Sequence, residues 1–311
     1  VSTSTRPGWS TPGRWGSRAM LNASSAATRQ RLKARLEAPE IIVAPGVFDA
    51  LSAVLAERAG FELAFFSGSV MATSHLARAD GVPLTRPDNA GIVQRAADRV
   101  RIPRVVDLDA AYGAAPHAAR AMRALERAGA AAVQVEDQQV VKPNDALTSR
   151  PLIGMREMQD KIRAMLDARE SADMLLSART DARDPAEALD RCLAYREAGA
   201  DLVFPEGTTD ATTLAELRGR LGPEVPIVYN NHYADADATT AAELQALGMS
   251  VVLFPVLAVR SAIAALEAAF AALAADPSLH GGGRSPLGTE AVNAVVESAE
   301  YLGRYRRPAE V

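Results

Sequence analysis

Eight short apolar runs, each followed by helical sequence, constrain the fold of this chain more than any other feature. Apolar runs of this length are typical of buried parallel strands. The sequence between them is rich in Ala, Leu and Arg and has helical patterns such as Asp49–Gly60. Eight such units predict an α/β fold, a closed (β/α)8 TIM barrel, rather than an open doubly wound sheet. The eight runs are Ile41–Pro45, Leu63–Ser67, Arg104–Leu108, Ala132–Glu136, Met174–Ala178, Leu202–Pro205, Pro226–Asn230 and Val251–Pro255.

Three connectors between helix and strand repeat the same arrangement. They are Glu57–Glu62, Glu126–Ala131 and Glu197–Asp201, and each contains a glycine after Ala. Glycine at this position ends a helix because it adopts the positive φ that the turn needs. The sequence contains no Gly-x-Gly-x-x-Gly motif and no Walker-type loop, so a nucleotide-binding fold lacks its usual support.

The length of 311 residues fits a single large domain with additions at both ends. We expect residues 23–280 to form the barrel and residues 281–311 to form a hinge and a C-terminal helix around Thr289–Tyr305. The hinge is expected because Gly281-Gly-Gly283 is flexible enough to let that helix leave its own barrel. Residues 1–22 are turn-rich, and we expect disorder or a translation extension there, with packing on a neighbouring subunit as the alternative.

Composition excludes several classes of partner. The net charge of −4 provides no basic face for nucleic acid. No uninterrupted apolar stretch approaches the roughly 20 residues of a membrane span, so no membrane contact is expected. The single cysteine, Cys192, cannot form an internal disulfide, which favours a reducing cytoplasm. Cys192 lies in a helical segment and is expected to be a packing residue rather than a reactive thiol.

Charged side chains stand at the ends of four of the predicted strands. They are Asp107 and Asp109, Glu136, Arg179 and Glu206. Charge at the carboxyl end of a buried strand is expected where ligands bind. Carboxylate oxygens suit a hard cation such as Mg²⁺, and a guanidinium suits a carboxylate or phosphonate. The sequence therefore predicts a metal and an anion bound at one mouth of the barrel.

Simpler interpretations of the same charges remain open. Asp107 and Asp109 are two residues apart and would share one face of an ideal strand, but a pair of solvated loop aspartates is also common. The alternative for Arg179 is a salt bridge with Asp181 or Glu136 at the barrel end.

Six motifs in one order give the chain a resemblance to a known family. The motifs are Phe48-Asp-Ala-Leu-Ser-Ala, Phe66-Ser-Gly-Ser, Asp107-Leu-Asp-Ala-Ala-Tyr-Gly113, Val135-Glu-Asp-Gln138, Ala178-Arg-Thr-Asp-Ala182 and Phe204-Pro-Glu206. In this combination the chain resembles the isocitrate lyase/phosphoenolpyruvate mutase superfamily, from roughly Ala44 to the end.

The resemblance implies a metal-dependent barrel enzyme that binds Mg²⁺, with Mn²⁺ as the alternative ion. It also implies a mobile loop, a C-terminal helix exchanged between subunits, and a homotetramer built as a dimer of helix-swapped dimers. Matched by motif, the metal ligand is Asp109, with Asp80, Asp107 and Glu136 acting through waters. The implied substrate-binding residues, by the same match, are Ser67, Gly68, Ser69, Arg179, Glu206 and Asn230.

The loop at residues 138–152 departs from the family pattern. Carbon–carbon lyases of the family carry Lys-x-Cys-Gly-His there, with the cysteine as general acid, whereas this chain has Lys142-Pro-Asn-Asp-Ala146. Asn144 stands at the cysteine position and delivers no proton at neutral pH. A lyase tyrosine before the Ser-Gly turn is also replaced, by Phe65. Lys142 and Asn144 instead approximate the Lys-x-Asn-Ser of phosphoenolpyruvate mutases and phosphonopyruvate hydrolases, so both are candidate catalytic residues.

Two side chains near the end of the seventh run are candidates for the missing acid. They are His232 and Tyr229, and His232 is preferred because the pKa of histidine lies near neutrality. The alternative for His232 is a loop residue that only forms hydrogen bonds.

The leading interpretation is a Mg²⁺-dependent lyase that cleaves a C–C bond of a small 2-hydroxy or 2-oxo di- or tricarboxylate through an enolate. The first alternative is P–C chemistry on phosphonopyruvate, which Asn144 favours and the negative charge of Glu206 opposes. The second is a barrel that binds a dicarboxylate without turnover. The clustered like charges argue against it, since an idle site gains nothing from them.

Overall fold

The computed structural model describes residues 25–79, 84–140, 150–208, 210–231, 240–277 and 287–303. Eight parallel strands form one sheet in the order β6-β5-β4-β3-β2-β1-β8-β7. The backbone N–H of Val203 donates to Pro226 O at 3.1 Å, and Val203 forms a parallel bridge with Ile227, which joins β6 to β7 and closes the ring. The predicted (β/α)8 barrel is therefore confirmed. The strands are β1 (Ile42–Val47), β2 (Ala64–Phe66), β3 (Arg104–Asp107), β4 (Ala132–Glu136), β5 (Leu175–Thr180), β6 (Leu202–Pro205), β7 (Val228–Asn230) and β8 (Val251–Phe254).

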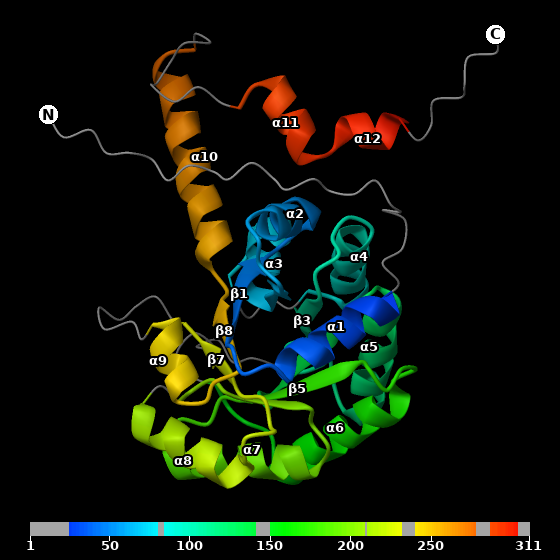
Figure 1. The fold of residues 1–311 in the computed structure, drawn as a ribbon, viewed down its shortest axis with the longest axis vertical. Coiled ribbons are helices and arrows are strands. Elements are labelled where there is room, and N and C mark those ends of the chain that lie inside the picture. Colours follow the sequence, from blue (N-terminus) through cyan, green and yellow to red (C-terminus); the bar gives the residue numbers. More distant parts are fainter. Residues whose placement is uncertain are drawn as a thin grey trace, which may run out of the picture.

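Helices follow the strands and surround the ring (Figure 1). The connectors behave as predicted, since Gly60, Gly129 and Gly199 end helices with φ of 91°, 97° and 105°. The helices are α1 (Ser25–Leu36), α2 (Ala50–Arg58), α3 (Gly68–Leu76), α4 (Arg86–Ala97), α5 (Ala115–Arg127), α6 (Met155–Ala168), α7 (Pro185–Glu197), α8 (Ala211–Leu221), α9 (Ala241–Ala246), α10 (Leu257–Ala275), α11 (Thr289–Val295) and α12 (Ser298–Gly303).

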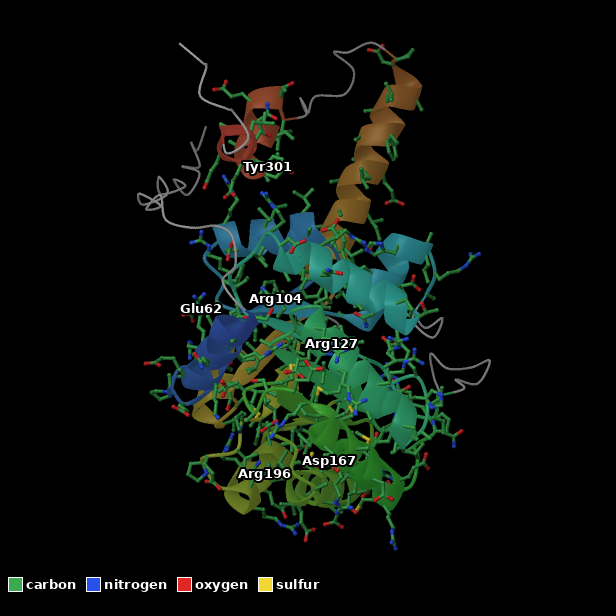
Figure 2. All side chains as sticks on the ribbon, turned by 90° about the vertical axis from the view of Figure 1, so that its right-hand side faces the viewer. Glu62, Arg104, Arg127, Asp167, Arg196 and Tyr301 are labelled. Carbon is green, nitrogen blue, oxygen red and sulfur yellow. The ribbon has the colours of Figure 1, made fainter. Side chains whose placement is uncertain are left out.

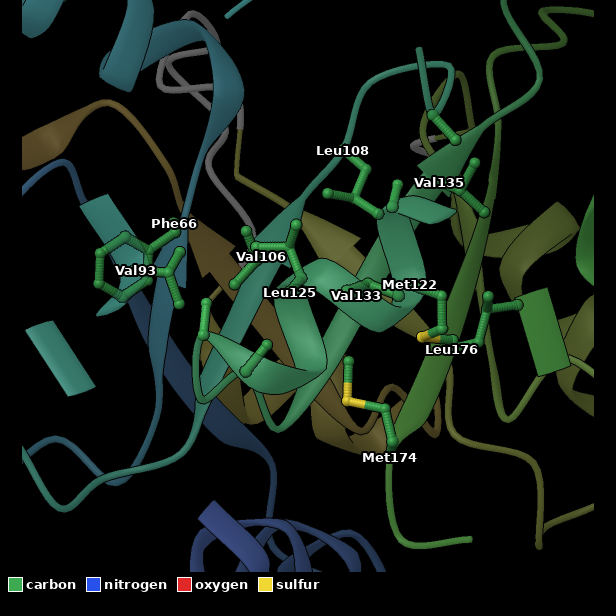
Figure 3. Close-up of a cluster of buried hydrophobic side chains, with 14 of the residues drawn as sticks. Phe66, Val93, Val106, Leu108, Met122, Leu125, Val133, Val135, Met174 and Leu176 are labelled. Atoms are coloured by element: carbon green, nitrogen blue, oxygen red, sulfur yellow. The ribbon is translucent and has the colours of Figure 1, made fainter. Parts of the chain in front are cut away.

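Alternation along the strands divides the core into an outer and an inner layer. Outward-facing residues such as Phe66 and Val106 pack against the surrounding helices, together with Met122 and Leu125 of α5 (Figure 3). Inward-facing residues such as Phe65 belong to a second cluster inside the barrel. Leu32 of α1 joins this inner cluster and closes the end of the barrel opposite the strands' carboxyl ends. The opposite, carboxyl end is thereby left for the site.

The C-terminal part differs from an ordinary eighth helix. Helix α10 packs near β1 and α3 at its start and then extends away from the barrel (Figure 1). Its apolar residues beyond that point are exposed, including Leu266 at 53% and Phe270 at 64%. Among the described helices, α10 alone has the length and apolar composition to cross a membrane, and 6% of it is buried. Arg260 and Glu267 interrupt its apolar sequence.

One predicted element is corrected by the structure. The expected single helix around Thr289–Tyr305 is two short helices, α11 and α12, because Glu297 adopts φ 56° between them. Arg99 holds this break, since it donates to Val296 O at 2.9 Å and lies 3.6 Å from the Glu297 carboxylate. Tyr301 lies on α12, beyond the body of the barrel (Figure 2). The hinge at residues 281–283 lies outside the described residues.

Candidate active site

A pocket of about 180 Å³ opens at the carboxyl ends of the strands. Residues of β2 to β8, or residues directly after them, contribute to its lining. The lining is polar and carries four carboxylates, those of Asp107, Asp109, Glu136 and Glu206. Three arginines, Arg150, Arg179 and Arg260, line the same space. The charged strand ends singled out in the sequence therefore meet in one cavity.

One part of this pocket, formed by Asp107, Asp109 and Glu136, is called the acidic side below. Asp107 and Glu136 are buried, with exposures of 6% and 2%. Asp107 Oδ2 accepts a hydrogen bond from the N–H of Gly68 at 3.2 Å, and its Oδ1 accepts from the N–H of Asp109 at 3.1 Å. Gly68 is the first residue of α3, so the positive end of that helix dipole faces the carboxylate. Two backbone donors thus fix the orientation of the Asp107 carboxyl group.

Asp109 reaches the same place by an unusual backbone conformation. The strand ends at Asp107, and Asp109 has φ 49°, in the left-handed region. The two carboxylates converge as expected. They do so through the left-handed turn at Asp109 and not, as predicted, because both residues lie on one face of a strand. A Cβ on Gly68 would lie 3.2 Å from Asp109 Oδ1 and 3.3 Å from Asp107 Oδ2. A side chain at this position would therefore crowd both carboxylates.

The acidic side fits a hard divalent cation. Its donors are carboxylate oxygens, the ligands that Mg²⁺ and Mn²⁺ prefer. Within the described residues, no group of three or more His, Cys, Asp or Glu side chains has the geometry of a complete metal cage. Mg²⁺ is commonly bound through one or two carboxylates, with waters and substrate oxygens completing the octahedron, so the converging pair Asp107 and Asp109 suits it.

The opposite part of the pocket is lined by Arg179, Glu206 and Asn230. Together with Asp181, which contacts Arg179, it is called the arginine side below. Asp181 accepts from Arg179 Nε at 3.0 Å and from Nη2 at 2.8 Å, a bidentate pair. Arg179 Nη2 also lies 3.4 Å from Glu206 Oε1, and Nη1 lies 3.7 Å from Glu136 Oε2. The guanidinium stands 5.4 Å above the Phe204 ring. The salt bridge considered for Arg179 is thus present, and Arg179 lines the pocket as well.

Two opposing effects set the protonation of this pair. Burial disfavours the charge of Arg179, but the carboxylates of Asp181, Glu206 and Glu136 outweigh it and raise its pKa well above the ordinary value. Burial likewise disfavours the charge of Asp181, while the charge and hydrogen bonds of Arg179 lower its pKa below the ordinary range. Both groups are therefore charged at neutral pH.

Glu206 is oriented by the neighbouring strand. Asn230 Nδ2 donates to both of its carboxylate oxygens at 3.1 Å. Arg150 comes from the segment that returns after residue 149, and its Nη1 lies 2.7 Å from Asp181 Oδ1 and 4.0 Å from Glu206 Oε1. Two arginines thus share the same two carboxylates.

A buried network behind Asp181 supports the arginine side. The backbone N–H of Asp181 donates to Asp137 Oδ1 at 3.0 Å. Asp137 Oδ2 accepts from Tyr195 OH at 2.6 Å and from Arg191 Nη1 at 3.0 Å, both on α7. Helix α7 therefore fixes the end of β5, which carries Arg179.

The remaining predicted residues have different outcomes. Ser67 and Ser69 line the pocket, and their hydroxyl oxygens lie 3.3 Å apart. Tyr229 packs instead against a third core cluster, which includes Leu217 of α8 and Val252 of β8, so the structure does not place it with the site. Cys192 is fully buried, as expected, and burial raises the pKa of its thiol. Four predicted residues, Asp80, Lys142, Asn144 and His232, lie outside the described residues.

Several residues of the site were missed in the sequence. Arg150 and Arg260 gave no signal because neither ends a strand. The sequence predicts Asp181 only as a salt-bridge partner of Arg179, and it predicts no role for Asn89. Asn89 does carry a signal, since it lies on the apolar stripe of α4 with Ile92 and Val93. Its Nδ2 donates to the backbone oxygen of Asp107 at 2.9 Å.

Comparison with known proteins agrees with this geometry. The family model described as phosphoenolpyruvate phosphomutase matches residues 32–274. A 2-methylisocitrate lyase of Aeropyrum pernix is 37% identical over 240 residues, which cover 76% of each chain. A 2,3-dimethylmalate lyase of Eubacterium barkeri is 32% identical, covering 82% of this chain and 89% of its own.

Solved structures of the same superfamily have the same fold. A crystal structure of 2,3-dimethylmalate lyase, described as a PEP mutase/isocitrate lyase superfamily member, superposes with a TM-score of 0.81 at 28% identity and covers 91% of this chain and 95% of its own. A phosphonopyruvate hydrolase in complex with oxalate and Mg²⁺ superposes with a TM-score of 0.80 at 26% identity and covers 89% of this chain and 97% of its own. The chain therefore belongs to the phosphoenolpyruvate mutase/isocitrate lyase superfamily and is one of its lyases.

Proposed function

We propose that this lyase cleaves a carbon–carbon bond of a small 2-hydroxy or 2-oxo di- or tricarboxylate and that it needs Mg²⁺, which Mn²⁺ would replace. The observation that carries the proposal is the meeting of the acidic side and the arginine side in one pocket of about 180 Å³. A substrate with carboxylates at both ends would use both sides at once. The relatives named 2-methylisocitrate lyase and 2,3-dimethylmalate lyase support this substrate class.

The residues of the pocket would divide the work of binding. Arg179 presents a planar fork toward a substrate carboxylate, and its bidentate pair with Asp181 fixes the orientation of that fork. Glu206, held by Asn230, would accept a hydrogen bond from a substrate hydroxyl. Ser67 and Ser69 would donate hydrogen bonds to carboxylate oxygens of the substrate. Asp109 would be the direct ligand of the cation, and Asp107 and Glu136 would act through waters. When bound, the cation supplies positive charge that stabilises substrate oxygens as negative charge develops on them.

The reaction also needs an acid that protonates the carbanion left after the bond breaks. We propose His232 for this role, because it lies two residues after the end of β7 and no His, Cys or Tyr lines the pocket among the described residues. His232→Gln should lower kcat by about 10²–10⁴-fold and remove a limb near the histidine range from the pH–rate profile. Iodoacetamide should leave the native enzyme active, because Cys192 is buried. Native turnover in His232→Gln would show that His232 is a loop residue without a catalytic role. Inactivation by iodoacetamide would indicate a catalytic role for Cys192.

A substrate screen tests the proposed reaction. Native enzyme is incubated with 2-methylisocitrate, 2,3-dimethylmalate, a series of related 2-hydroxy acids and phosphonopyruvate, with Mg²⁺ or with EDTA, and release of 2-oxo acid and of phosphate is measured. We expect metal-dependent release of a 2-oxo acid from at least one 2-hydroxy acid. Phosphate release from phosphonopyruvate alone would establish the P–C alternative, which Lys142-Pro-Asn144 favours. Binding without any turnover would establish the non-catalytic alternative.

We also propose that the enzyme is a cytoplasmic homotetramer with exchanged C-terminal helices. The exposed apolar face of α10, with Ile263, Leu266 and Phe270, supports a protein partner, and a second copy of the chain is the occupant we propose. Light scattering should report an oligomer, and Phe270→Glu should dissociate it. A native protein that stays monomeric at micromolar concentration, or that sediments with lipid vesicles through α10, would contradict this assembly.

A further inference from the structure

Lys161, on α6, is a buried cation that lies behind the acidic side. Its exposure is 1%, and its amine donates to the backbone oxygen of Ala110 at 3.2 Å. Lysine is rarely buried to this degree, because its charge loses hydration there. Burial lowers the pKa of Lys161, although the charges of Glu157, Asp137 and Glu136 oppose this. A methionine of similar length would pack at this position without that cost, so the amine needs another explanation.

The segment that Lys161 contacts has a strained backbone. Asp109, Ala111 and Tyr112 have φ of 49°, 59° and 62°, which is unusual for three non-glycine residues so close together. Such conformations persist only where the surroundings impose them. The direction of the Asp109 carboxylate depends directly on this backbone.

Lys161 acts where the support from the sheet ends. The segment is paired with β4 up to Asp109, whose oxygen accepts from Glu136 N at 3.0 Å. Ala110 O is the first carbonyl beyond that pairing, and Lys161 holds it. On the opposite flank, Asn89 of α4 holds the Asp107 oxygen at 2.9 Å and the Tyr112 hydroxyl at 3.0 Å. The left-handed turn is therefore fixed between two buried side chains from flanking helices.

We propose that Lys161 is a positioning residue for the metal site, because its hydrogen bond to Ala110 O keeps Asp109 in the left-handed conformation that aims its carboxylate at the cation. The proposal rests on the proposed metal-binding role of the acidic side. A positioning role and a purely electrostatic role of Lys161 have opposite effects on Mg²⁺ affinity. Loss of positioning weakens Mg²⁺ binding, whereas loss of a repelling charge alone would strengthen it.

Calorimetric titration of Mg²⁺ into the full chain tests this inference, with thermal unfolding of each variant as the check on folding. Lys161→Met should weaken Mg²⁺ affinity by about 10–100-fold, the usual loss when a residue that orients a metal ligand is removed. Lys161→Arg keeps a charged donor and should recover most of the affinity. Lys33→Met is the matched control, because it removes the same charge from the surface of α1, where Lys33 is 52% exposed.

Each outcome has one meaning. Affinity in a folded Lys161→Met that equals or exceeds that of the native enzyme would overturn the inference, and so would an equal loss in Lys33→Met. If Lys161→Met does not fold, the comparison uses Lys161→Gln, a shorter neutral donor, which must bind Mg²⁺ more weakly than Lys161→Arg. Native enzyme that binds no Mg²⁺ would instead refute the proposed metal site itself.

Discussion

The acidic side and the arginine side of the pocket face each other, but their supports differ in kind. On the arginine side, charged side chains hold one another, with Asp181 bidentate to Arg179 and Arg150 on the same carboxylate. On the acidic side, backbone amides of Gly68 and Asp109 hold Asp107, and Asp109 itself sits in a left-handed turn. The two sides meet in the ion pair of Arg179 with Glu136 at 3.7 Å, and the acidic side also gathers its carboxylates near the N-terminus of α3.

This difference separates two tasks. A guanidinium fixed by its own ion pairs is preorganised and needs little rearrangement when a substrate carboxylate arrives. Carboxylate oxygens gathered in one place are the donors that a divalent cation prefers. We therefore expect changes on the acidic side to act through the metal and changes on the arginine side to act through substrate affinity and stability.

The largest effect is expected on the acidic side, from Asp109→Asn. This change keeps the shape of the side chain and removes its charge, so the cation would lose the ligand proposed as its most direct one. Because metal stabilisation of developing charge contributes several kcal/mol, kcat should fall by at least about 10³-fold. Steady-state kinetics with saturating Mg²⁺ measures the loss, and an unchanged thermal midpoint shows that the fold is intact. A near-native kcat in this variant would show that the acidic side does not bind the catalytic metal.

A smaller effect is expected from Arg179→Lys on the arginine side. Lysine keeps the positive charge but lacks the planar fork of arginine. It therefore cannot form the bidentate pair with Asp181 while it also contacts the substrate. Loss of one charged hydrogen bond should lower kcat/KM by about 10–100-fold. Mg²⁺ affinity, measured in parallel, should stay close to native. A parallel loss of Mg²⁺ affinity would mean that the two sides are not separable.

The smallest effect on catalysis, and the clearest on stability, is expected from Asp181→Asn. The pKa of Asp181 is below its ordinary value in the folded state, so its carboxylate stabilises the fold above the unfolded pKa of about 3.9, and this contribution is lost as pH falls further. Removing one partner of a buried pair should cost about 3 kcal/mol at pH 7. Urea unfolding at pH 7 and below pH 4 should show that this difference narrows in acid. Asp160→Asn, on the exposed surface of α6, is the control and should change little.

Much of the barrel could be predicted from the sequence because strand periodicity and helix-ending glycines are local signals. All eight runs became strands, two with the predicted boundaries and the others with boundaries shifted by at most two residues. The terminal helix was predicted as one element because nothing in Val295-Val296-Glu297 indicates the left-handed Glu297, which Arg99 contacts from the turn after α4. Long-range contacts of this kind leave no local pattern.

The candidate site was predictable only where chemistry stood at a strand end. Asp107, Glu136, Arg179 and Glu206 were found this way. Tyr229 was misplaced because alternation on β7 sends Asn230 inward and Tyr229 outward. Lys161 carried a signal that was overlooked, since a lysine on the stripe of Met158, Ile162 and Met165 interrupts an apolar face. Polar residues on such stripes are therefore the ones to examine first in similar barrels.

The separate roles of the two sides are tested most directly by the binding of oxalate, measured by calorimetry with and without Mg²⁺. Oxalate is a planar dianion with the shape of a 2-oxo carboxylate, and it is small enough for the pocket. We predict that native enzyme binds oxalate in Mg²⁺, that binding disappears in EDTA or in Asp109→Asn, and that Arg179→Lys retains it with lower affinity. Oxalate that binds equally well in EDTA and in Mg²⁺ would contradict the account, because the arginine side alone would then hold the anion.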